Sequence, residues 1–237
     1  MIKHNFPGAG ARLGNKIFVD VMMSLLAKKY DYKIQSFLSQ QECAKLGIQL
    51  FSGSIEKTRM QNYTDNNLMQ LTNQNISDID GINYTGYCQS PEVITKHIEE
   101  INEICNRSLS KEPIEETFIH IRLGDLAYSQ NMKPLDIEYY EECIDKSGSK
   151  NIVISTDTPN HHLIKTLLDK HGAKIFISTD PVEVINFGRR FSKIIASFGT
   201  FSWWIAFLSG HKNIYYPSPQ RPGNFSPFLG LSDWNFV

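Results

Sequence analysis

The sequence is short of cysteine, of charge imbalance and of long apolar stretches, and each shortage excludes a class of protein. Its four cysteines are widely spaced and form no CxxC pair, which excludes the common zinc and redox motifs. A net charge of −1 provides no basic surface for nucleic acid. No apolar run approaches the ~20 residues of a membrane-spanning helix. A hydrophobic fraction of 41% and a charged fraction of 21% are ordinary for a soluble globular protein.

The first residues also lack the pattern of a secretory signal, because Lys3 and His4 are followed closely by Pro7 and two glycines. We therefore expect a cytoplasmic protein in a reducing compartment. The cysteines are then expected to be small buried apolar residues. A length of 237 residues suits one large domain or two smaller ones.

The second half of the chain alternates regularly between strand and helix patterns. Strands are predicted at residues 118–122, 151–155, 174–177, 193–196 and 213–216, with helices at 135–147, 160–171, 181–191 and 203–209 between them. This alternation is typical of a parallel, Rossmann-like α/β sheet.

The first half is less regular. Helices are predicted at residues 15–30, 40–46 and 91–106, a strand at 82–87 and a possible strand at 32–37, whereas 52–83 suggests loops and short elements. A polar stretch before the strand at 118 favours a division there. We predict a first domain over 1–110, a second over 111–216, and a tail over 217–237 that packs on the domains.

The most informative stretch is Phe118-Ile-His-Ile-Arg-Leu-Gly-Asp125, a buried strand that ends in polar residues. Ligands of open α/β sheets bind at the carboxyl ends of the strands. The guanidinium of Arg122 has the donor geometry that suits a diphosphate. The alternative is a core strand ending in a surface ion pair, and the octet alone does not decide between the two.

Two more loops should lie at the same edge of the sheet. Residues 197–202 are small and rich in hydroxyls and open a helix, so that Thr200 or Ser202 can be its N-cap. The start of that helix favours an anion. Asp157 follows the neighbouring strand and can accept hydrogen bonds from a base or ribose. Trp203 and Trp204 are expected in the core.

A glycine-rich loop at residues 7–14 precedes the first predicted helix. Such a loop can bring backbone N–H groups close to an anion. Its glycines fit neither the GxGxxG fingerprint nor a Walker loop, so a simple tight turn is the alternative.

Several of these stretches resemble the donor-site motifs of fucosyltransferases that use GDP-fucose. His120-Ile-Arg-Leu-Gly-Asp125 resembles their His-x-Arg-x-x-Asp motif, and Ile194-Ile-Ala-Ser-Phe-Gly-Thr-Phe-Ser-Trp-Trp204 resembles the Ile-Ile-Ala-Asn-Ser-Ser/Thr-Phe-Ser-Trp-Trp segment of bacterial α-1,2 enzymes. Matches at Ser155-Thr-Asp157, Arg12-Leu-Gly-Asn15 and Gly86-Tyr-Cys-Gln-Ser90 complete the series in the family's order. The chain is most similar to the bacterial and viral type of α-1,2-fucosyltransferase, in glycosyltransferase family 11.

The resemblance implies a GT-B fold, in which two Rossmann-like domains face each other across a cleft. It implies an inverting transfer of L-fucose from GDP-fucose to a glycan hydroxyl, with no metal or other cofactor. Arg122 would neutralise the departing phosphate, with Asn15 and Asp125 as the other catalytic residues. The remaining donor-binding positions would be Arg12, Gly14, His120, Asp157, Thr200, Phe201 and Ser202.

Some questions stay open at this point. The family's second arginine is Leu123 here and the second acid of its Ser-Asp-Asp segment is Thr158, so another nucleotide sugar, such as a xylose or rhamnose donor, is an alternative. A non-catalytic module that binds a sugar or nucleotide is a further alternative. Asp125 and Asp20 are both candidates for the general base that accepts the acceptor's proton, and a late proton transfer without any carboxylate is the alternative.

Overall fold

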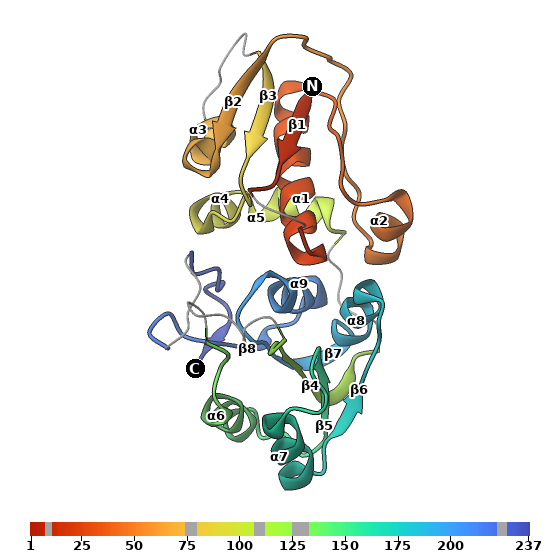
Figure 1. Cartoon of the computed structure of the whole chain (residues 1–237), viewed down its shortest axis with the longest axis vertical. Helices are drawn as coiled ribbons and strands as arrows, with labels where there is room; N and C mark the ends of the chain where they lie inside the picture. Colours follow the sequence, from red (N-terminus) through yellow and green to blue (C-terminus); the bar gives the residue numbers. More distant parts are fainter. Residues whose placement is uncertain (8–10, 74–79, 107–111, 125–132, 222–226) are drawn as a thin grey trace. The chain divides into compact units, whose positions relative to one another are not determined.

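The structure is a computed structural model that describes residues 1–7, 11–73, 80–106, 112–124, 133–221 and 227–237. The chain divides into two compact units, residues 1–107 and 108–237. Each unit carries helices around a parallel sheet (Figure 1). The predicted α/β class with parallel sheets is confirmed.

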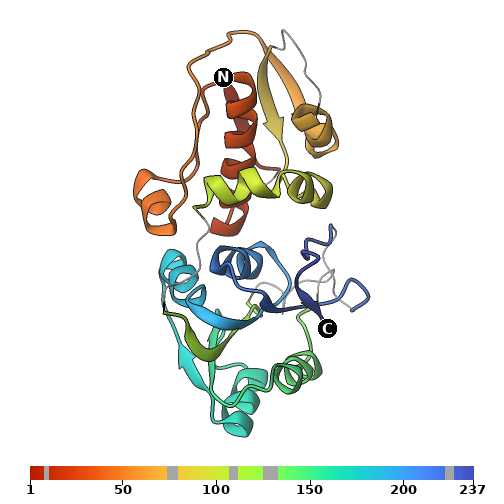
Figure 2. The same ribbon diagram turned by 180° about the vertical axis from the view of Figure 1, so that it is seen from behind.

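The first unit is built on a three-stranded sheet in the order β1-β3-β2. Helix α1 lies along one face of this sheet, as Figure 1 and Figure 2 show from opposite sides. The elements are β1 (Ile2–Asn5), α1 (Leu13–Tyr30), α2 (Gln40–Leu46), β2 (Met60–Thr64), a 3-10 turn η1 (Asp65–Asn67), α3 (Leu68–Asn73), β3 (Gly81–Thr85), α4 (Pro91–Lys96) and α5 (Ile98–Ile104).

Two predictions for the first unit were wrong. Residues 32–37 form only isolated bridges, Ile2 with Ile34 and Tyr32 with Ile55. At the end of this segment the backbone N–H groups of Phe37 and Leu38 donate to Asp20 of α1 and not to a strand. The single helix expected over 91–106 is two helices. They are separated at His97, whose φ of −109° and ψ of 25° leave the helical region.

The second unit contains a six-stranded parallel sheet in the order β6-β5-β4-β7-β8-β9. Helices α6 and α7 cover one face and α8 and α9 the other (Figure 1 and Figure 2). The elements are β4 (Ile114–Ile121), α6 (Ile137–Ser147), β5 (Ile152–Thr156), α7 (His162–His171), β6 (Lys174–Phe176), α8 (Pro181–Gly188), β7 (Phe191–Ile195), α9 (Thr200–Ser209), β8 (Asn213–Tyr216) and β9 (Asn235–Phe236).

All five strands predicted for the second half are present, within a few residues of the expected bounds. The sixth, β9, comes from the predicted tail and adds to the edge of the sheet beside β8. Trp203 and Trp204 are 0% and 1% exposed, which confirms their expected place in the core. The strands carry apolar residues on both faces because helices cover both faces of the sheet.

Candidate active site

The strand order of the second unit defines where a ligand can enter. Counted along the chain of this unit, β4 is the first strand and β7 the fourth, and the two lie side by side. The chain leaves the carboxyl ends of these strands toward opposite faces of the sheet, which opens a crevice there in doubly wound folds. Arg122 follows β4 directly, and the loop at residues 196–199 follows β7. The structure thus brings together the two loops that carry the strongest motifs.

The alternation of side chains along β4 determines on which face of the sheet His120 lies. Ile119 and Ile121 belong to the apolar core formed with residues of α6 and α7. Phe118 points to the opposite face, where its ring centroid lies 6.0 Å from that of Phe187 in α8. Successive strand residues alternate between faces, so His120 also lies on the side of α8 and α9.

His120 is buried in a chain of hydroxyl groups. Its Nδ1 lies 2.6 Å from the Oγ of Ser202, which lies 2.9 Å from the Oγ of Ser197. Its ring centroid is 5.1 Å from that of Phe201. Burial is the main reason that the pKa of His120 is lowered to about 4; the charge of Asp157 opposes the lowering, and the charge of Arg122 adds to it. The imidazole is therefore neutral at pH 7, and the charge of this cluster comes from Arg122.

Gly199 makes room for the guanidinium of Arg122. With a φ of 106° and a ψ of 160°, Gly199 adopts a backbone conformation that is essentially restricted to glycine. A Cβ atom at this position would lie 2.5 Å from the Nη1 of Arg122. The guanidinium therefore lies against the first residue of the loop-to-helix turn, beside the N–H groups that open α9. Both features attract an anion.

The expectation that Thr200 or Ser202 caps α9 was wrong. Gly199 is the N-cap residue, and within the described residues no side chain makes the capping hydrogen bond. The reason is that α9 begins at Thr200, so both residues lie inside the helix, and Ser202 directs its hydroxyl to His120 and Ser197. Thr200 is the first residue of the helix. As a glycine, the N-cap residue has no side chain that could accept a hydrogen bond from the backbone N–H groups of this first turn.

Asp157 fixes the turn that follows Arg122. Its Oδ1 accepts hydrogen bonds from the backbone N–H groups of Leu123 and Gly124, both at 3.0 Å. A Cβ on Gly124 would lie 2.6 Å from the other carboxylate oxygen, so the glycine permits the close approach. Leu123 is fully buried in the core. Asp125 lies outside the described residues.

In the first unit, two of the recognised stretches lie together. The Nε2 of Gln89 donates to the Oδ1 of Asn15 at 3.1 Å, which links the stretch at 86–90 to the start of α1. Arg12 is the exposed N-cap residue of α1, and its carbonyl accepts the backbone N–H of Asn15. Gly14 is buried. These residues follow the carboxyl ends of β1 and β3.

Two aspartates with structural roles were not identified as such from the sequence. Asp65 accepts hydrogen bonds from the hydroxyl of Tyr84 and from the backbone N–H groups of Tyr87 and Cys88. Asp20, a candidate general base, is 1% exposed. Burial raises its pKa, although the hydrogen bond from Ser36 opposes this. Its carboxylate is engaged by the loop at residues 36–38, so we assign it a structural role.

The chain contains one Asp-x-Asp triplet, Asp78-Ile-Asp80, of the kind that binds a metal in some glycosyltransferases. Asp78 lies outside the described residues. The Oδ2 of Asp80 lies 3.2 Å from the Nε of Arg59, in an ion pair within the first unit.

Comparisons with known proteins extend this description. A search of curated protein sequences found no match to the chain. A structure of the Escherichia coli heptosyltransferase WaaC with ADP is 10% identical, with a TM-score of 0.48, and the match covers 100% of this chain and 92% of that one. A structure of POFUT1 in complex with GDP is 12% identical, with a TM-score of 0.43, and covers 99% and 97%. No helix of the described segments is long and apolar enough to cross a membrane.

A family assignment comes from the sequence itself. The sequence model of glycosyl transferase family 11 matches residues 58–229, which is well over half of the chain. The matched region includes the stretches around Arg122 and Thr200 and the turn at 86–90. This is the family that the motifs resemble. The chain therefore belongs to glycosyl transferase family 11 and is a glycosyltransferase.

Proposed function

We propose that the protein transfers L-fucose from GDP-fucose to a hydroxyl group of a glycan, with inversion and without a metal ion. The transferase activity follows from the family, and the motif resemblance favours this donor. The observation that carries the proposal is the position of the Arg122 guanidinium against Gly199, at the start of α9 and at the switch point of the sheet.

In this proposal the diphosphate binds at the carboxyl ends of β4 and β7. Arg122 contacts the β-phosphate, together with the hydroxyl of Thr200 and the N–H groups of Thr200 and Phe201. As the bond between sugar and phosphate breaks, negative charge accumulates on the leaving phosphate. Donors held at fixed positions stabilise that charge in the transition state, where it is larger than in the bound substrate.

In this proposal His120 and Asp157 mainly hold other groups of the site in position. The neutral imidazole keeps Ser202 oriented through the 2.6 Å contact, so the first turn of α9 is fixed beside the phosphate. Asp157 holds the turn after Arg122 and has its second oxygen close to Gly124. That oxygen is the candidate acceptor for a nucleoside hydroxyl or amino group.

The first unit supplies the acceptor side. The proposal assigns acceptor binding to the first unit, and the motif resemblance gives Arg12 and Asn15 roles in the transfer. Inversion requires the acceptor hydroxyl to attack the sugar carbon opposite the leaving phosphate while a base accepts its proton. Asp125 is the candidate base, since the carboxylate of Asp20 is already engaged.

A pair of measurements tests the donor. Thermal melting with GDP, UDP or ADP identifies the nucleotide, because a ligand that binds only the folded state raises the melting temperature. We expect stabilisation by GDP, and stabilisation by UDP or ADP alone would reject GDP-fucose.

Donor turnover should then continue in excess EDTA and produce an inverted anomeric configuration, measured by NMR of the product. Loss of turnover in EDTA would contradict metal independence.

A further inference from the structure

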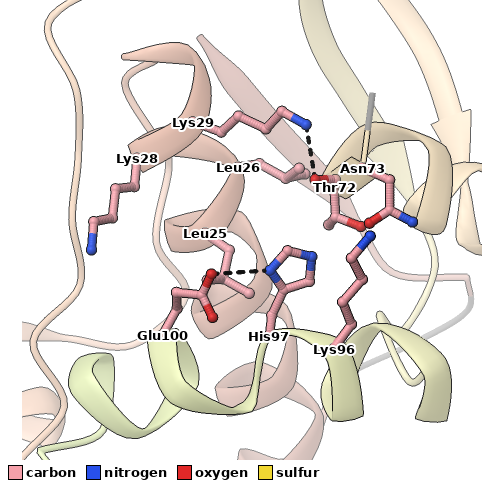
Figure 3. A pocket seen from close by; sticks show the side chains of 9 residues that line it. All are labelled: Leu25, Leu26, Lys28, Lys29, Thr72, Asn73, Lys96, His97 and Glu100. Carbon is pink, nitrogen blue, oxygen red and sulfur yellow. Dashed lines mark hydrogen bonds and ion pairs between the residues drawn. The ribbon is translucent and has the colours of Figure 1, made fainter. Parts of the chain in front are cut away.

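A pocket in the first unit lies away from the residues assigned to the transfer. It has a volume of about 450 Å³ and is formed where the second half of α1 meets α3 and the junction of α4 and α5 (Figure 3). Volumes of a few hundred Å³ are typical of sites for small molecules. Leu25 and Leu26 provide an apolar wall, and polar side chains provide the others.

The charge of the pocket is mainly positive. Lys29 reaches across it and donates from Nζ to the backbone carbonyl of Thr72 at 2.8 Å (Figure 3). Lys96 extends from the end of α4 toward the same wall. Burial lowers the pKa of Lys29, and the charge of Lys96 lowers it further, which shows that the two ammonium groups repel each other. An anion placed between them would relieve this repulsion.

Neither Glu100, the one carboxylate among the described lining residues, nor the nearby Glu103 neutralises these two lysines. Glu100 accepts a hydrogen bond at 3.3 Å from the Nδ1 of His97, and Lys28 is paired with Glu103 at 3.2 Å. Among the described residues, neither Lys29 nor Lys96 has a carboxylate within ion-pairing distance. The ammonium groups of Lys29 and Lys96 thus lie in one pocket without a counter-ion from the described part of the chain.

His97 provides a separate observation. Its Nε2 is buried and makes no hydrogen bond to any described residue, although the other ring nitrogen is fixed by Glu100. In Figure 3 this nitrogen points away from Glu100 and into the pocket. A buried polar atom without a partner is unfavourable, and it is commonly satisfied by a water molecule or a ligand. The imidazole therefore offers a third polar contact beside the two ammonium groups.

We propose that this pocket binds a sugar-sized molecule that carries a phosphate or carboxylate group. Lys29 and Lys96 hold the anionic group, His97 contacts a hydroxyl or anionic oxygen, and the leucine wall packs against the C–H face of the ring. The pocket is distinct from the start of α1: Lys29 follows Asn15 by 14 residues, or roughly 20 Å along a helix. The inference goes beyond the proposed transfer and does not depend on the identity of the donor.

Titration calorimetry of the whole protein tests the site with four probes, namely glucose 6-phosphate, glucuronate, inorganic phosphate and uncharged glucose. We expect saturable binding of at least one of the two charged sugars and none of glucose. Binding should weaken with added salt, because partly exposed charges are screened. Preference for glucose 6-phosphate would identify phosphate as the ligand group, and preference for glucuronate would identify carboxylate. No saturable binding of either charged sugar would overturn the proposal.

The variant Lys96→Gln removes one charge at an exposed position and should weaken binding about tenfold, since charge-assisted contacts are strong. Lys165→Gln makes the same change on the exposed face of α7 and should leave the affinity unchanged. Equal affinity of wild type and Lys96→Gln would overturn the proposal. The melting-temperature shift produced by GDP is measured in parallel. Competition between GDP and the charged sugar would place both in one site and also overturn it.

Discussion

The carboxyl edges of the two sheets are held in place by different chemistry. In the first unit, Asp20 and Asp65 each accept several hydrogen bonds from loop backbones. In the second unit, hydroxyls and a neutral imidazole connect β4 to α9, and only Asp157 uses a carboxylate in this way. The first edge therefore contains two carboxylates that hold loops, with Arg12 exposed at the start of α1, whereas the second places the guanidinium of Arg122 against the glycine N-cap of α9.

This difference indicates which edge suits a diphosphate. The carboxylate of Asp20 is buried and repels a second anion strongly, because water is excluded around it, whereas the exposed carboxylate of Asp65 repels an anion more weakly. The guanidinium of Arg122 and the N-terminus of α9 act in the opposite direction. The first edge is better suited to a neutral hydroxyl-bearing acceptor, with Asn15 and Gln89 as hydrogen-bonding groups. Four substitutions and their controls test this contrast.

The largest effect is expected from the two arginines. Arg122→Ala should reduce kcat for donor turnover about 1,000-fold, or about 4 kcal/mol, because it removes charge stabilisation in the transition state. Arg12→Ala should reduce it about tenfold, since Arg12 lies on the other edge. Rates are measured with the donor at saturation, and circular dichroism checks that both variants are folded. A larger loss for Arg12→Ala would reverse the assignment of the two edges.

The next effect concerns stability. Asp20→Ala should lower the free energy of unfolding by about 3 kcal/mol, because it leaves buried N–H groups of the loop at 36–38 without an acceptor. Asp157→Ala, at an exposed position, should lower it by about 1 kcal/mol. Urea denaturation at pH 7 measures both. Equal losses of unfolding free energy in the two variants would mean that the two carboxylates contribute equally to stability.

The two units also differ in how much of their structure is predictable from the sequence. Strand β5 begins with the apolar run Ile152-Val-Ile154, and consecutive residues are also buried at the ends of β4 and β7, because helices bury both faces. Strand β2 has one buried residue, Tyr63, and β1 has two. Their other side chains form a polar face, with Asn83 bonded to both Asn5 and Asn62. Such strands give almost no hydrophobic signal.

The site shows the same limit. Arg122, His120 and Asp157 were predictable because parallel strands bring their carboxyl ends to one edge. The contact of Ser202 with His120 was not predictable from the sequence, since it depends on the rotation of α9 about its own axis. The role of Asp65 was equally hidden: it joins a turn 22 residues away by hydrogen bonds that no local pattern encodes. The order of strands and helices can therefore be inferred from sequence patterns. The side-chain hydrogen bonds that hold the loops can be identified only in the three-dimensional structure.

A third test compares the buried histidines of the two edges. The pKa of His120 is about 4 in the folded protein, below its ordinary value of 6.5. Between these values the unfolded chain binds a proton and the folded protein does not, so stability is lost as pH falls from 6.5 toward 4. At pH 5.0 the loss from His120 should be about 2 kcal/mol.

The control for that test is His4, whose pKa is also lowered by burial, against the opposing effects of Gly86 and Asp65. Urea denaturation at pH 7.5 and 5.0 is compared for wild type, His120→Gln and His4→Gln. We expect His120→Gln to remove more of the pH dependence than His4→Gln. An unchanged pH dependence in His120→Gln would mean that the imidazole is not held neutral in the folded protein.

The last pair of substitutions separates the effect of backbone strain on stability from the effect of Arg122's position on turnover. Gly199→Ala should lower the free energy of unfolding by about 2 kcal/mol, because alanine is strained at a φ of 106°. Gly172 ends α7 with a φ of 58°, and a Cβ there meets nothing within 4 Å, so Gly172→Ala should lower it by about 1 kcal/mol. The methyl group at 199 would also displace Arg122, so donor turnover should fall about tenfold in Gly199→Ala and stay unchanged in Gly172→Ala. Retention of full turnover by a folded Gly199→Ala protein would show that Arg122 does not need its place at the start of α9.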